Sequence, residues 1–96
     1  MSEAAPERHR ARARIANEKG LHARASAKIV EATARFKSHI TISFNGETVD
    51  ADSILDLMML GAGIGKDIEI EAVGPDAAEA LTAMVALVKA RFGEDK

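Results

Sequence analysis

Two segments near opposite ends of the chain alternate between apolar and charged residues, and their charges are opposite in sign. The first, residues 9–16, has arginine at every second position: Arg10, Arg12 and Arg14. The second, residues 67–73, has acids at every second position: Asp67, Glu69 and Glu71. A period of two is typical of a strand with one buried and one solvated face. Because opposite charges on neighbouring strands attract, we predict that the first and last strands of the sheet are paired.

Two further strands are predicted between these segments. Residues 39–44 alternate in the same way, and residues 47–50 form a returning strand after Asn45-Gly46. Asparagine followed by glycine favours a tight hairpin, because both turn positions tolerate positive φ.

Three segments have the periodicity of helices. The first runs from Ala23 to about Phe36. Its predicted apolar stripe consists of Ala23, Ala27, Val30 and Ala34, with Ile29 and Phe36 to one side. The second begins at Ser53 and runs to about Leu60, and the third begins at Asp76 and is ended by Gly93. Both of these later helices start with a capping-box pattern, in which a carboxylate follows the cap residue by three positions.

The resulting order is β-α-β-β-α-β-α. It predicts an α+β fold, an open-faced β-sandwich whose four-stranded, mostly antiparallel sheet is covered on one face by three helices. A chain of 96 residues is expected to form one domain. We place this domain at residues 9–93, between a flexible N-terminal tail at 1–8 and a C-terminal tail at 94–96.

Composition excludes several classes of function. The net charge is −2 and aromatic residues make up 3% of the chain, so we expect no nucleic-acid binding and interpret the arginine stripe as a solvated sheet face. There is no cysteine, and no apolar run approaches the roughly 20 residues that span a bilayer. We therefore predict a cytoplasmic monomer with no membrane contact, no bound metal and no cofactor.

The segment from Gly20 to Ala27 carries the chemistry. His22 lies at the last position before the first predicted helix, where unpaired backbone N–H groups favour an anion. Arg24 adds a permanent cation whose fork geometry suits phosphate oxygens. Because a neutral imidazole is a nucleophile near neutral pH, this arrangement points to a phosphohistidine. By contrast, the glycine-rich segment 61–65 follows a helix and precedes a strand, so we interpret it as a plain loop.

Over residues 10–92 the chain resembles the HPr family, the phosphocarriers of the bacterial phosphoenolpyruvate-dependent phosphotransferase system. The resemblance is carried by G-L-H-A-R-A-S-A, by the N-G hairpin and by D-S-I-L-D-L-M-M-L-G-A-G. It implies that the protein is a carrier and not an enzyme, with His22 accepting the phosphoryl group through Nδ1 and Arg24 steadying it. It also implies that enzyme I is the donor and that an EIIA domain is the recipient.

The resemblance further assigns the start of the second helix. Ser53 matches the position on which an HPr kinase/phosphorylase acts in some bacteria, and an exposed docking patch is matched by Ile54, Leu55 and Met58. Two departures stand out. Ala25 replaces a proline that many relatives have, and acids surround Ser53 at positions 50, 52 and 56. A phosphate would add charge among these negatives, so a regulatory site and a plain helix cap both stay open for Ser53.

Three functional hypotheses follow from the sequence. The first is a phosphoryl carrier of the sugar-transporting system. The second is a regulatory module of the nitrogen-related branch, in which phosphorylation changes the protein partner and no sugar is moved. The third is a ligand-binding α+β domain whose histidine is incidental.

Overall fold

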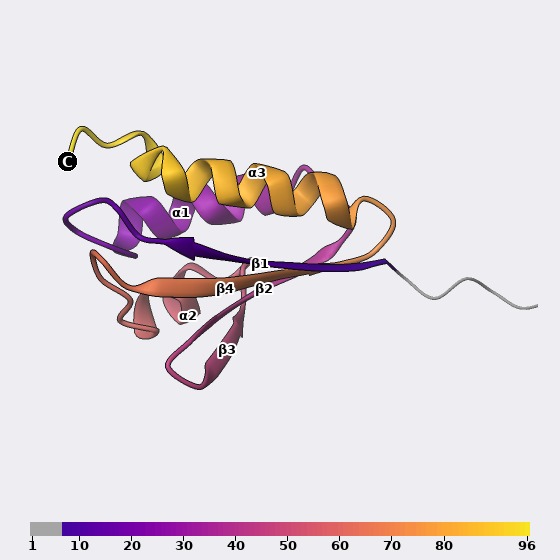
Figure 1. Ribbon diagram of the computed structural model, residues 1–96, viewed down its shortest axis with the longest axis horizontal. Helices are drawn as coiled ribbons and strands as arrows, with labels where there is room; N and C mark the ends of the chain where they lie inside the picture. The colour runs from indigo at the N-terminus through magenta and orange to yellow at the C-terminus, as the bar shows by residue number, and fades with distance from the viewer. Residues whose placement is uncertain (1–6) are drawn as a thin grey trace, which may run out of the picture.

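An antiparallel sheet with the strand order β1-β4-β2-β3 forms one layer of the computed structural model, and the two long helices form the other (Figure 1). The structure describes residues 7–96. The strands are β1 (Arg8–Arg14), β2 (His39–Phe44), β3 (Glu47–Asp50) and β4 (Asp67–Val73). The helices are α1 (Ala23–Thr33), α2 (Ile54–Met59), α3 (Ala77–Lys89) and the short 3-10 helix η1 (Arg91–Gly93). The predicted fold class is confirmed. The flexible tail expected at 1–8 falls mostly outside the described residues, and Arg8 already belongs to β1.

The predicted pairing of the first and last strands is confirmed. β1 and β4 are antiparallel neighbours. Their register places three pairs of opposite charges directly across from one another: Arg10 and Glu71, Arg12 and Glu69, Arg14 and Asp67. The corresponding N···O distances are 2.7, 3.4 and 3.0 Å. Hydrogen bonds from Arg14 to Asp67 and from Arg10 to Glu71 hold the pKa of each carboxyl below its ordinary value. We call these three pairs the charge ladder.

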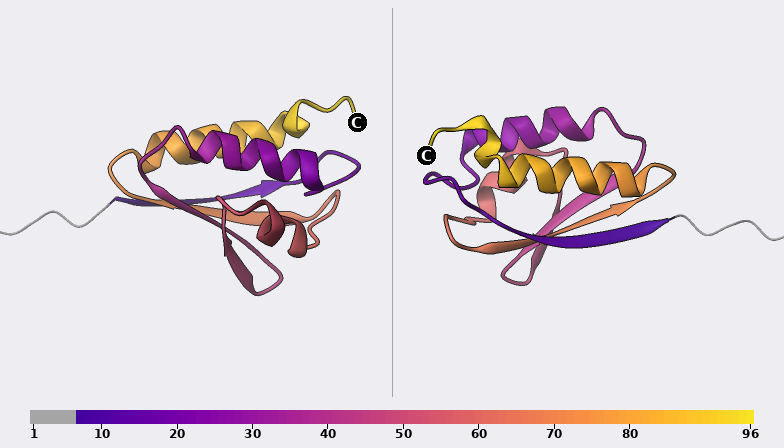
Figure 2. Two further views of the ribbon diagram at one scale, coloured as in Figure 1. Left: turned by 180° about the vertical axis from the view of Figure 1, so that it is seen from behind. Right: turned by 45° about the horizontal axis from the view of Figure 1, so that its top comes forward.

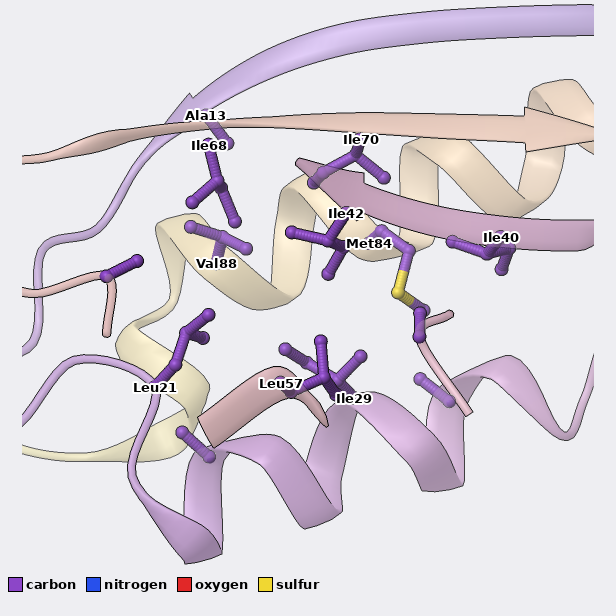
Figure 3. Close-up of a cluster of buried hydrophobic side chains, with 14 of the residues drawn as sticks. Ala13, Leu21, Ile29, Ile40, Ile42, Leu57, Ile68, Ile70, Met84 and Val88 are labelled. Atoms are coloured by element: carbon purple, nitrogen blue, oxygen red, sulfur yellow. The ribbon is translucent and has the colours of Figure 1, made fainter. Parts of the chain in front are cut away.

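The core lies between the sheet and the helices (Figure 3). It contains Ile68 and Ile70 of β4, Ile42 of β2, and side chains from all three α-helices: Ile29, Leu57, Met84 and Val88. α1 and α3 lie over the same face of the sheet (Figure 2), and α2 packs against α1. None of the helices among residues 7–96 is long and apolar enough to cross a membrane.

The predicted face of α1 was partly wrong: Ile29, expected at one side of the stripe, is buried, but the buried face is not centred on the predicted alanines. The buried residues are Ala25, Ser26, Ile29 and Ala32, whereas Ala23 and Ala34 are exposed. The helix is rich in alanine, so its apolar residues occur on more than one face. Burial of Ile29 releases more apolar surface from water than burial of any alanine, and this decides which face packs against the core.

The start and end of α3 also differ from prediction. Asp76 is the N-cap residue, but its side chain makes no capping bond. It accepts hydrogen bonds from Lys37 N, Ser38 N and Ser38 Oγ (2.9, 2.8 and 2.6 Å), which tie the loop before β2 to the start of α3. The helix ends at Lys89 rather than Gly93, because Arg91 and Phe92 adopt positive φ. Phe92 then fills the core, and the chain turns toward the start of α1.

Candidate functional site

His22 is the N-cap residue of α1, as the sequence predicts. Its backbone is extended, with φ −75° and ψ 178°, and its carbonyl oxygen accepts the first helical bond from Ser26 N (2.9 Å). The backbone N–H groups that come before Ser26 in the first turn of α1 have no acceptor within the helix. Ser26 is fully buried, and its hydroxyl donates to the carbonyl of Leu21 (3.2 Å), so it satisfies a backbone group rather than acting on His22.

The loop before His22 is fixed by the glycine-rich segment that follows α2. Gly20 has a φ of +61°, and a Cβ at this position would lie only 2.5 Å from the carbonyl oxygen of Ala62. The N–H of Leu21 donates to the same oxygen (3.1 Å). Only glycine allows so close an approach in this backbone conformation. Segment 61–65 therefore supports the loop that carries His22.

The imidazole of His22 contacts a carboxylate from the far end of the chain. Its Nε2 lies in hydrogen-bond contact with Oε2 of Glu94. The side-chain amide of Asn17 donates to Oε1 of Glu94 (3.1 Å) and to the carbonyl of Gly20 (2.9 Å). Burial alone would raise the pKa of Glu94, but the bonds from His22 and Asn17 and the charges of His22 and Lys19 together hold this pKa below its ordinary value. Glu94 is therefore an anion at neutral pH.

A shallow pocket surrounds His22. Its lining includes four cationic side chains, from Lys19, Arg24, Lys28 and Lys96, and three acidic ones, from Glu18, Glu94 and Asp95. Arg24 is exposed, and the described residues place no carboxylate within ion-pair distance of its guanidinium. The Nζ of Lys28, in contrast, donates to the carbonyl of Phe92. Together with the start of α1, these cations favour an anion beside His22.

The second group of predicted residues lies on α2. Ser53 is the N-cap residue, and its Oγ accepts a hydrogen bond from Asp56 N (3.3 Å), so the capping role is confirmed. Ile54, Leu55 and Met58 are exposed, while Leu57 is buried. Two residues outside the predicted docking patch, Met59 and Ile64, are exposed as well. We call these five exposed residues the α2 patch. The segment that follows α2 bonds to Leu21, so the patch lies on the same part of the molecule as His22.

Sequence analysis missed Glu94 and Asn17. We placed Glu94 in a C-terminal tail, whereas it contacts His22, and Glu18 N donates to Lys96 O nearby (3.1 Å). Figure 2 shows the C-terminus beside the loop that precedes α1. The predicted topology could have indicated that the C-terminal residues lie near the start of α1. A helix that follows β4 and packs back across the sheet must end where β1 ends, which is where α1 begins.

The pocket gives no indication of a metal site. Within residues 7–96, no group of three or more His, Cys, Asp or Glu side chains could hold a metal ion.

Comparisons with known proteins show the family of this chain. The family described as "PTS HPr component phosphorylation site" matches residues 9–90. The phosphocarrier protein HPr of Cupriavidus necator is 51% identical over 80 residues, which cover 83% of this chain and 90% of that protein. The phosphocarrier protein NPr of Shewanella violacea is 44% identical over 80 residues, or 83% of this chain and 88% of that protein.

Solved structures show the same relationship. The crystal structure of HPr-C-His from Thermoanaerobacter tengcongensis superposes with a TM-score of 0.86 at 35% identity, and the match covers 92% of this chain and 99% of that one. The chain therefore belongs to the HPr family, the phosphocarrier proteins of the phosphotransferase system.

Proposed function

We propose that this protein accepts a phosphoryl group on Nδ1 of His22 from phosphoenolpyruvate-charged enzyme I and passes it to an EIIA domain. The observation that carries the proposal is the contact between Nε2 of His22 and Glu94, which leaves Nδ1 as the nitrogen able to react. The start of α1 and the guanidinium of Arg24 supply the positive surroundings that a phosphoryl group requires.

In the proposed step, the lone pair on Nδ1 attacks phosphorus. A bond forms between Nδ1 and phosphorus as the bond between phosphorus and the donor atom of enzyme I breaks, and that donor atom keeps the electron pair. The imidazole proton stays on Nε2, and the ring gains positive character. Transfer to the recipient repeats the step in reverse, so the carrier is regenerated without net chemistry of its own.

The α2 patch is the proposed docking surface for both partners. Leu55 and Met59 are 68% and 73% exposed, so this short helix presents apolar surface that the fold itself does not cover. A partner seated there would lie beside the loop that carries His22. We also propose that the protein acts as a monomer.

Regulation at Ser53 is a separate proposal. The hydroxyl is half-buried and caps α2, and a phosphate there would face Asp56 of the first turn. We therefore expect an HPr kinase/phosphorylase, if it acts on Ser53, to alter the start of α2 and so the adjoining patch.

Relatives carrying the names HPr and NPr both match this chain, which keeps a second candidate function in view. In this alternative the protein is a regulatory module of the nitrogen-related branch, and the phosphorylation state of His22 selects its protein partner. Transfer assays against each EIIA domain of the source organism separate the two functions. Rapid transfer to a sugar-specific domain supports the first, and transfer confined to a nitrogen-related domain supports the second.

The first test is phosphorylation by phosphoenolpyruvate and a cognate enzyme I. Mass spectrometry is expected to show one added phosphate that is labile in acid and stable in base, and His22→Ala is expected to abolish it. His39→Ala is the matched control, because His39 is an exposed histidine that contacts a carboxylate, Asp50 (2.8 Å), away from the pocket. An unlabelled wild type, or a labelled His22→Ala variant, would contradict the proposal.

A further inference from the structure

We propose that Glu94 is a positioning residue that keeps the ring proton of His22 on Nε2 and thereby presents the lone pair of Nδ1 to the incoming phosphoryl group. This inference rests on the proposed function. It adds to that function a residue from the C-terminal end of the chain.

The first step of the argument concerns proton placement. An ionised carboxylate only accepts hydrogen bonds, so the ring nitrogen that contacts Oε2 of Glu94 must carry a proton. A neutral imidazole has a single N–H. Its other nitrogen, Nδ1, therefore holds the lone pair. In hydrolytic triads, likewise, a carboxylate accepts a hydrogen bond from one ring nitrogen of the histidine and so leaves the lone pair on the other nitrogen.

The second step concerns how Glu94 is held. Asn17 is fully buried, and its amide donates to Oε1 of Glu94 while also bonding the carbonyl of Gly20. Each carboxylate oxygen thus has its own donor, and the side chain of Glu94 is only 15% exposed. Two further hydrogen bonds fix the backbone on either side of Glu94. The Nζ of Lys28 donates to the carbonyl of Phe92, and the backbone N–H of Glu18 donates to the carbonyl of Lys96. A carboxylate held in this way keeps a defined orientation toward His22, unlike the carboxylate of an unsupported surface pair.

The third step concerns charge. During phosphoryl transfer the ring gains positive character, and the carboxylate of Glu94 faces this charge from the Nε2 side. The pocket cations Lys19 and Arg24 line the same site and can receive the phosphoryl oxygens. Glu94 therefore stabilises the transition state through the ring without contacting the transferred group.

The variant Glu94→Gln tests proton placement directly. Glutamine keeps the shape of the side chain, but an NH2 donor replaces one of the two carboxylate oxygens. It therefore cannot accept from Asn17 at one position and from Nε2–H at the other. ¹⁵N NMR of His22 in the neutral form is expected to show only the Nε2–H tautomer in wild type and a measurable Nδ1–H population in Glu94→Gln. Glu47→Gln is the matched control. It makes the same substitution at an exposed side chain of β3 that does not line the pocket, and we expect the wild-type tautomer.

The kinetic arm measures acceptance from enzyme I. We expect Glu94→Gln to slow acceptance about 2- to 10-fold, as for the loss of one hydrogen bond, in a variant that unfolding curves show to be folded. Glu47→Gln should retain the wild-type rate. A wild-type proton on Nδ1, an unchanged tautomer in Glu94→Gln, or faster acceptance by that variant would overturn the inference. The NMR arm needs no phosphoryl transfer, so a failure of the proposed function is distinguishable from a failure of this one.

Discussion

The charge ladder between β1 and β4 and the cluster of Asn17, His22 and Glu94 both pair carboxylates with nitrogen groups, but in different settings. The ladder repeats along two strands, and its arginine side chains are 65–70% exposed. In the cluster, His22 and Glu94 are 26% and 15% exposed, and Asn17 is buried. Exposed pairs exchange readily with water and contribute little individually. The ladder therefore helps to set strand register, whereas the sheltered cluster can fix where a single proton resides.

The largest effect is expected at the glycine that supports the site. Gly20→Ala forces a Cβ to within 2.5 Å of a backbone oxygen in a left-handed conformation, so the free energy of unfolding should fall by about 1–3 kcal/mol or more. Gly46→Ala is the matched control, because Gly46 also has positive φ (+84°) but nothing within 4 Å of the added Cβ. Urea unfolding of both variants measures the difference. Equal losses would show that the close approach to Ala62 does not matter.

The next effect separates the two regions by function. Arg24→Ala removes the pocket cation and should slow phosphoryl acceptance about 10-fold, the scale of one charge-assisted hydrogen bond. Arg12→Ala removes a ladder cation and should leave the rate unchanged. Quench-flow labelling with enzyme I provides both rates, and unfolding curves check that each variant folds. Equal rates for wild type and Arg24→Ala would contradict the role assigned to Arg24.

The smallest effect concerns the ladder and its dependence on pH. Arg10 and Arg8 lower the pKa of Glu71 in the folded state, so the stability that these contacts provide is present above the ordinary carboxyl range near pH 4 and is lost as the pH falls through the folded-state pKa. Glu71→Gln should therefore unfold slightly more easily than wild type at pH 7, and the difference should disappear near pH 2.

The exposed acid Glu31 of α1 supplies the matched control for this measurement, as Glu31→Gln. Its substitution removes the same charge outside the ladder. A difference between Glu71→Gln and wild type that persists unchanged at acid pH would break the assignment of the ladder to strand pairing.

Sequence patterns predicted the strands correctly, because the alternation of residues along a strand is regular. The strands 39–44, 47–50 and 67–73 have the predicted bounds, and the ladder joins the two strands predicted to pair, because alternation fixes both the face and the charge of each residue. The cap at Ser53 was also correct, since it depends only on residues three positions apart.

Prediction failed where a side chain or a turn is fixed by contacts with residues far away in the chain. Asp76 has the spacing of a capping residue, but its carboxylate bonds Ser38 and Lys37 from another loop. Gly93 has the character of a helix end, but the positive φ of Arg91 and Phe92 ends α3 earlier. That turn brings Glu94 to His22. A local pattern contains no information about such a contact, which spans 72 positions of the chain.

The measurement that tests the account most directly is the position of the phosphoryl group on the ring. Phosphorylated protein labelled with ¹⁵N, studied by ³¹P and ¹⁵N NMR, shows which imidazole nitrogen is bonded to phosphorus. We predict coupling to Nδ1 of His22, with the proton retained on Nε2 beside Glu94. Phosphorus bonded to Nε2, or to any residue other than His22, would contradict the account.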